Sequence, residues 1–177
     1  MIKLKVPTLF AIAFLASGLA SAGPTDIDLS ARDRADLLQV AAAVKDAILR
    51  GDSTAFLGFV SQIQGLVCTD TVYRYDKVAR YLRDKGSYLY MGLFDSEHFA
   101  GQCGKDYSPE YPATSDKAFF ERSPNSSIEI TFSAKGYAEV TYSPGAAELY
   151  PLKYEFHKEA HGWKLVGGII IGNCSCG

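Results

Sequence analysis

The sequence lacks the short motifs that mark several large enzyme classes. It has no G-x-S-x-G nucleophile elbow, no phosphate-binding P-loop and no glycine pattern for a dinucleotide. Positive charge is also scarce, because 18 Lys and Arg stand against 20 Asp and Glu, and this argues against nucleic-acid binding. Beyond residue 22, no apolar run approaches the roughly 20 residues that a membrane-spanning helix needs.

What is present begins with the pattern of a secretory signal. Two lysines precede an apolar run over residues 9–15, and a small-residue A-x-A cleavage site ends at Ala22. We therefore expect residues 1–22 to be removed on export to the periplasm or the extracellular space. Residues 23–177 are long enough to form a single domain with its own hydrophobic core.

The first half of this domain has helical periodicity. Two helices are expected, ending at Gly51 and Gly65, and a third follows Asp76 and breaks near Gly86. The first begins at a Ser30 cap. The apolar residues on the faces of the first two helices are Leu37, Val40, Ala41, Val44, Ile48, Phe56, Leu57, Val60 and Ile63. A short strand is expected at residues 66–68, and a long loop over residues 101–126, with a short helix near 117–122 inside it.

The last third changes to a period of two. Strands are expected over residues 127–134, 137–142, 152–157 and 163–171, joined by short turns such as Lys135-Gly136. Short connections between alternating strands predict an antiparallel meander. One face of this meander is apolar, so the helices must cover it. The predicted fold class is α+β.

This order of elements resembles the nuclear-transport-factor-2-like superfamily. The resemblance rests on the helix ending at 41–52, the helix at 56–60 and the final hairpin at 154–166. It implies a curved sheet that wraps a helix into a cone. The family includes isomerases, dehydratases, ligand-binding modules and interaction domains, so the fold leaves the function open. Its isomerases use a carboxylate that faces a tyrosine and acid pair, and no position here matches them, so no catalytic residue is assigned.

The four cysteines, Cys68, Cys103, Cys174 and Cys176, are expected to form structural disulfides after export. A bridge within the C-x-C tail would close a small, strained ring. We therefore favour pairing of each tail cysteine with Cys68 or Cys103, which would clamp the last strand onto the helices. The alternative is a Cys68–Cys103 bridge with a separate tail pair. A redox role for the tail is a further alternative.

Other chemistry-bearing residues are scattered. His157 and His161, together with the tail cysteines, have ligand types that zinc accepts. The histidine spacing spans a turn rather than a helix, so we favour exposed turn histidines, and no metal or cofactor is expected. The acid–base candidates near the sheet are Asp70, Asp76, Glu129, Glu139, Glu155 and His157. Strand alternation predicts that Glu129 and Glu155 face solvent.

Five tyrosines crowd the third helical region, and they are the candidate ligand or partner surface: Tyr73, Tyr75, Tyr81, Tyr88 and Tyr90. We favour ordinary core packing for them, with their hydroxyls at the boundary of the core. We favour a non-catalytic exported binding or protein-interaction domain of unknown partner, in an envelope or toxin-neutralising role. The alternatives are a small-molecule isomerase or lyase, and a carrier of a small hydrophobic ligand inside the cone. The sequence predicts no oligomeric state.

Overall fold

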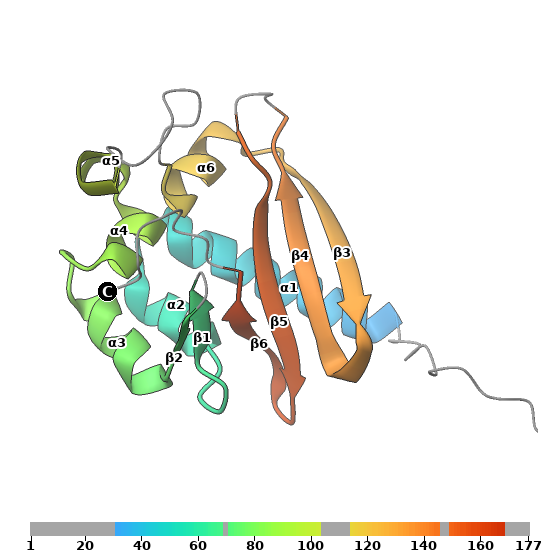
Figure 1. Cartoon of the computed structure of the whole chain (residues 1–177). Coiled ribbons are helices and arrows are strands. Elements are labelled where there is room, and N and C mark those ends of the chain that lie inside the picture. Colours follow the sequence, from blue (N-terminus) through green and yellow to red (C-terminus); the bar gives the residue numbers. More distant parts are fainter. Residues whose placement is uncertain (1–30, 69–70, 104–113, 146–148, 169–177) are drawn as a thin grey trace, which may run out of the picture.

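A computed structural model of the chain describes residues 31–68, 71–103, 114–145 and 149–168. In this part, helices pack against a four-stranded antiparallel sheet (Figure 1). The predicted α+β class, with helices on a meander, is confirmed. The elements are α1 (Ala31–Leu49), α2 (Ser53–Phe59), β1 (Leu66–Cys68), β2 (Thr71–Tyr73), α3 (Tyr75–Arg83), α4 (Tyr88–Phe94), α5 (Ser96–Cys103), α6 (Asp116–Arg122), β3 (Ser127–Ser133), η1 (Ala134–Gly136), β4 (Tyr137–Ser143), β5 (Leu152–Glu159) and β6 (Gly162–Gly167).

The main sheet has the order β3-β4-β5-β6, in which each strand pairs with the next one along the chain. The turn between β3 and β4 needs two residues with positive φ, Lys135 at 70° and Gly136 at 78°. Glycine adopts this conformation without steric cost, as expected for the predicted tight turn. The strands β1 and β2 form a separate hairpin.

The alternation along β4 and β5 creates one buried face. Val140 and Tyr154 are register partners, and both have no exposed surface. Figure 1 shows α1 crossing the sheet on this side, behind the strands. The Tyr142 hydroxyl donates a hydrogen bond to the Ala41 carbonyl at 3.1 Å, and Trp163 Nε1 donates to the Asp33 carbonyl at 3.1 Å. The sheet is therefore closed over α1 by both apolar packing and specific hydrogen bonds.

The helix boundaries follow the expected capping chemistry. Asp52 caps α2 by accepting a hydrogen bond from the Ala55 amide at 2.9 Å, and Gly51 before it has a φ of 66°. Ser87 caps α4 in the same way, through the Tyr90 amide at 3.1 Å. The expected break near Gly86 is confirmed, because α3 ends at Arg83 and α4 begins at Tyr88.

The second helix is shorter than expected. We predicted that it would bury Ile63, and this is wrong, since α2 ends at Phe59 and Ile63 is 83% exposed. Backbone pairing with the sheet overrides the helical pattern here. Val60 forms a parallel bridge with Leu165, and the Ser61 amide donates to the Leu165 carbonyl at 3.0 Å. The chain therefore leaves the helix to join β6, and Ile63 lies in the turn that follows.

The long segment before the sheet is more helical than expected. The predicted loop over 101–126 begins inside α5, which the sequence pattern did not indicate. The predicted short helix is confirmed as α6. Residues 104–113 lie outside the described part of the chain, as do Ser30, the expected signal at 1–22 and the end of the predicted last strand.

Truncation of a side chain in the closed interior tests this packing. We expect Phe156→Ala to lower the free energy of unfolding by about 3–5 kcal/mol, because Phe156 is fully buried on β5 and a cavity would remain. Ile63→Ala is the matched control and should change it by less than about 0.5 kcal/mol. Urea unfolding followed by circular dichroism measures both. Equal effects of the two substitutions would contradict the described core.

Candidate functional site

A buried carboxyl group lies at the start of α6. Ser115 caps this helix by accepting a hydrogen bond from the Ala118 amide at 3.3 Å. The next residue, Asp116, is 7% exposed and points into the core. There the Tyr154 hydroxyl, from β5, donates a hydrogen bond to Asp116 Oδ2 at 2.5 Å. The helix and the sheet thus meet at one acid and one phenol.

The described side chains around this pair are aromatic and buried. The Tyr142 ring lies edge-on to Tyr154 at 6.0 Å and to Phe120 at 5.0 Å. Burial raises the pKa of Asp116 from 3.8 to about 7, and the hydrogen bond from Tyr154 only partly opposes this. Burial, followed by the nearby Asp116 charge, raises the pKa of Tyr154 well above 10.0. Burial also raises the pKa of Tyr142. Both phenols are therefore neutral hydrogen-bond donors near pH 7.

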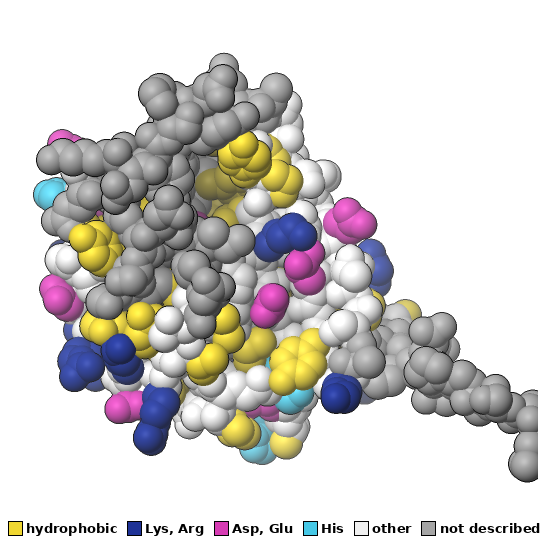
Figure 2. Space-filling view, viewed as in Figure 1, with side chains coloured by type: hydrophobic (Ala, Val, Ile, Leu, Met, Phe, Trp, Pro, Cys, Tyr) yellow, Lys and Arg dark blue, Asp and Glu magenta, His cyan; other side chains and the backbone are white. Residues whose placement is uncertain are grey.

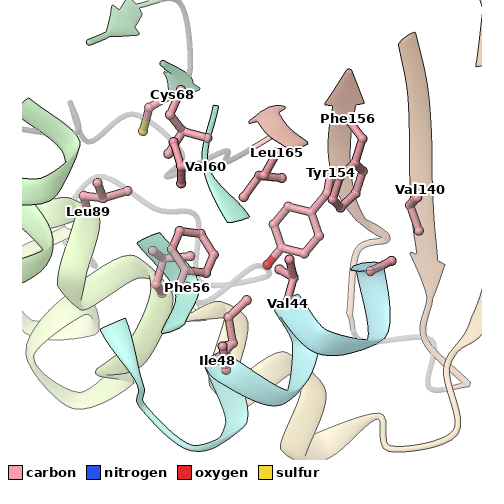
Figure 3. Close-up of a cluster of buried hydrophobic side chains, with 14 of the residues drawn as sticks. Val44, Ile48, Phe56, Val60, Cys68, Leu89, Val140, Tyr154, Phe156 and Leu165 are labelled. Atoms are coloured by element: carbon pink, nitrogen blue, oxygen red, sulfur yellow. The ribbon is translucent and has the colours of Figure 1, made fainter. Parts of the chain in front are cut away.

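A carboxyl group with a pKa near neutrality, held beside a phenol, has the properties of a general acid or base. Among the described residues, however, the side chains around Tyr154 are closely packed. Tyr154 and Val140 on the sheet and Val44 on α1 all have no exposed surface. Figure 3 shows Tyr154 reaching from β5 toward α1, with Val44 and Leu165 beside it. In the described part of the chain, the pair therefore acts as a structural link between α6 and β5.

Asp116 was missing from the residues that the sequence suggested. The sequence does contain a pattern that indicates the position of Asp116. Asp116, Phe119 and Phe120 have the i, i+3, i+4 spacing of one helix face. Two buried phenylalanines on that face place Asp116 inward. A seven-residue helix in a presumed loop gave too little context for this inference.

The carboxylates that the sequence did suggest lie outside the core. Glu129 and Glu155 are exposed, as the alternation predicts, and Asp76 is exposed beside Arg74. Glu139 is half-buried and accepts a hydrogen bond from Lys153 Nζ at 2.8 Å, which lowers its pKa. Asp70 lies outside the described residues.

The outer face of the sheet has an open hollow beside Glu139 and Glu155. Its volume is about 360 Å³, and it is lined by Thr131, Ser133, Tyr137, Ala138, Glu139 and Glu155. The hollow is separated from the buried Asp116–Tyr154 pair by the sheet, since Glu139 and Glu155 alternate with the inward Val140 and Tyr154. The sheet therefore has no described passage that connects the two.

The two histidines lie in different surroundings at the end of β5 and in the turn that follows it. His161 is exposed in the turn before β6, as expected. His157 is half-buried, which corrects the expectation of an exposed turn residue. Its ring lies 4.4 Å from that of Tyr137, and its Nδ1 is 2.7 Å from Gln64 Nε2. Across the described ranges, no three His, Cys, Asp or Glu side chains are grouped so that they could hold a metal ion.

Cys68 is buried on β1 and is bonded in a disulfide. Its partner is not among the side chains that the structure describes, so the pairing pattern stays a prediction. The side chain of Cys103 and all of Cys174 and Cys176 lie outside the described part.

The five candidate tyrosines pack against the core, as the favoured alternative predicts. Tyr73 is buried, and the other four are half-buried against the core. Around α3, however, cations lie over two of their rings. Lys77 Nζ is 4.1 Å from the centroid of the Tyr73 ring and 5.3 Å from that of Tyr81. The Arg80 guanidinium lies 5.7 Å from the Tyr81 centroid.

We call the basic side chains of this helix and its flanks the α3 surface: Arg74, Lys77, Arg80, Arg83 and Lys85. Figure 2 shows dark blue side chains gathered over α3, at the lower left. The Nε atom of Arg74 lies 3.7 Å from Oδ1 of Asp76. For the other four cations, no ion pair with a described carboxylate is formed. Sequence reasoning missed this surface because the charge was counted over the whole chain.

The helices of the described part include none that is long and apolar enough to cross a membrane. A scan against protein-family models gives no match, and a search of curated proteins finds no similar sequence.

Two solved structures are similar to this chain, both with a TM-score of 0.37. One is an NTF2-like protein of unknown function from Shewanella oneidensis MR-1, with 16% identity over 76% of this chain and 94% of the other. The second is from Streptomyces avermitilis and is named a candidate dehydratase of the NTF2-like family, with 11% identity over 77% and 93%.

The buried carboxyl group predicts an unusual pH dependence of stability. Between pH 3.8 and about 7, Asp116 is neutral in the folded protein and ionised in the unfolded chain. Its contribution is therefore fully present below pH 3.8 and is lost as the pH rises toward 7. Relative to Asp116→Asn, the wild-type protein should lose on the order of 4 kcal/mol across this range.

Urea unfolding of both proteins from pH 4 to pH 8 measures this difference. Asparagine is a suitable comparison because it stays neutral and its amide oxygen still accepts the Tyr154 hydrogen bond. Groups such as Glu139, whose pKa is lowered, act in the opposite direction at low pH in both proteins and cancel. A stability difference that does not change with pH would contradict the buried, neutral carboxyl group.

Proposed function

We propose that this protein is an exported, non-catalytic binding domain that contacts another protein through its outer surface. The observation that carries the proposal is the burial of the sheet face toward α1 in the described part of the chain. Tyr142, Tyr154 and Phe156 point there from β4 and β5, and none has exposed surface. A small molecule needs a preformed cavity of some hundreds of Å³. In the described part of the chain, the protein's own side chains occupy this position instead.

The composition of the α3 surface supports binding on the outside. Arginine and tyrosine are enriched where protein interfaces gain most of their affinity. Here Arg80 lies over the Tyr81 ring, and Lys77 lies over Tyr73 and Tyr81. Val72, on the neighbouring strand β2, is 62% exposed and adds apolar area. These groups form one continuous stretch of the chain, from β2 through α3.

Export and disulfide bonding are part of the same proposal. They are supported by the leader-like residues 1–22 and by the bonded state of Cys68. A protein in the cell envelope, or a toxin that this domain neutralises, fits as partner.

One observation favours a second candidate, an isomerase or lyase. The Asp116–Tyr154 pair supplies the acid and the phenol that such chemistry needs. This reading requires α6 to move away from the sheet, so that a substrate reaches Asp116. A carrier of hydrophobic ligands would likewise need an opened interior.

Peptide mapping without reduction tests the exported, stapled state. From a bacterial periplasm, we expect a chain that begins at residue 23 and has no free thiol. Peptides that contain Cys174 or Cys176 should be linked to those of Cys68 and Cys103. Reduction should lower the free energy of unfolding by roughly 3–4 kcal/mol per bridge in the chain-entropy model. Four free thiols on an uncleaved chain would contradict export and stapling together.

Affinity capture from envelope extract, combined with native mass spectrometry, tests the binding role. We expect the wild-type protein and Arg32→Gln/Arg34→Gln to retain the same partner, and Arg80→Gln/Arg83→Gln to lose it. The first pair is the matched control, since it removes two exposed cations from α1. A small molecule that co-purifies with the protein, and is lost in Tyr154→Phe, would contradict the proposal and favour the enzyme or carrier.

A further inference from the structure

The positive charge of this protein is concentrated on one short stretch. Residues 74–85 carry five basic and two acidic side chains, whereas the rest of the chain carries 13 basic and 18 acidic ones. The α3 surface is therefore a local cationic patch on an otherwise acidic molecule. At physiological salt, charges influence each other over about 8 Å, so a partner that contacts α3 meets mainly this patch.

The cations of the patch are positioned before any partner arrives. The Lys77 ammonium is placed over two tyrosine rings, and the Arg83 Nε donates a hydrogen bond to the Ala79 carbonyl at 3.1 Å. Such contacts reduce the conformational entropy that the side chains lose on binding. No described carboxylate neutralises Arg80, Arg83 or Lys85. Their guanidinium and ammonium groups keep hydrogen-bond donors available for an anionic partner.

We infer that the α3 surface binds an acidic segment of a partner protein. This inference rests on the proposed binding function and names the chemistry of the partner. Arginine, which supplies three of the five cations, bonds carboxylates with two parallel hydrogen bonds. The tyrosine rings and exposed Val72 suit the apolar side chains that flank carboxylates in a protein segment.

The size and surroundings of the patch favour a protein over larger polyanions. The nine residues of α3 span about 14 Å, which an extended segment of about four residues matches. Asp76 and Asp84 interrupt the patch, and the rest of the molecule is acidic. An anionic membrane or a nucleic-acid duplex extends well beyond 14 Å, so it would face this negative charge as well.

Fluorescence anisotropy with a labelled ten-residue glutamate peptide tests the inference at low ionic strength. We expect wild-type protein to bind this peptide and not a glutamine peptide of equal length. Arg80→Gln/Arg83→Gln should raise the Kd about tenfold, the effect of losing two exposed ion pairs, and added salt should weaken binding. The control Arg32→Gln/Arg34→Gln should change the Kd less than about twofold.

Absence of peptide binding, or equal weakening by the two variants, would overturn the inference. Binding of phosphatidylglycerol vesicles or of a DNA duplex through Arg80 and Arg83, without binding of the peptide, would also overturn it. Circular dichroism and thermal unfolding show whether the variants remain folded. If the peptide does not bind, yet envelope extract still yields a partner, the binding function stands and only the acidic partner on α3 is wrong.

Discussion

The closure of the apolar sheet face over α1 is the constraint on which the rest of the structure depends. A four-stranded meander with one apolar face is unstable in water unless that face is covered. Here α1 covers it, and the hydrogen bond from Tyr142 to the Ala41 carbonyl fixes the helix against the strand. This packing leaves Tyr142 and Tyr154 without exposed surface on the face toward α1.

The same closure explains the unusual state of Asp116. An ionised carboxylate is costly in a dry environment, and the single described hydrogen bond from Tyr154 does not offset that cost. A pair of this kind is often a sign of catalysis. In this protein the neighbours have no exposed surface, so the pair joins α6 to β5 and makes that junction sensitive to pH.

The meander was predictable because period-two alternation has few competing explanations, and burial confirms it at Ala138, Val140 and Tyr142. Local chemistry also predicted that the first helix ends at Gly51, which has a positive φ of 66°. Ile63 was wrongly assigned because the pairing of Ser61 with Leu165 is a contact between distant parts of the chain. No local pattern contains such a contact.

Much less of the candidate site than of the fold could be predicted from the sequence. The tyrosines near α3 were found from their number, but their role depends on the cations that fold onto them. Asp116 was missed because its burial is set by α6 docking on β5, and the sequence showed only a charged residue in a proline-containing segment. Total charge likewise concealed the basic α3 surface. A count of charge over the short stretch 74–85 would have shown it.

In the described part of the chain, the protein's own side chains occupy the space between the sheet and α1. A high-resolution crystal structure of residues 23–177 would show this space. We expect Tyr154 in direct hydrogen-bond contact with Asp116, and no water or ligand density between β5 and α1. A solvent-filled or ligand-filled cavity that reaches Asp116 would contradict it.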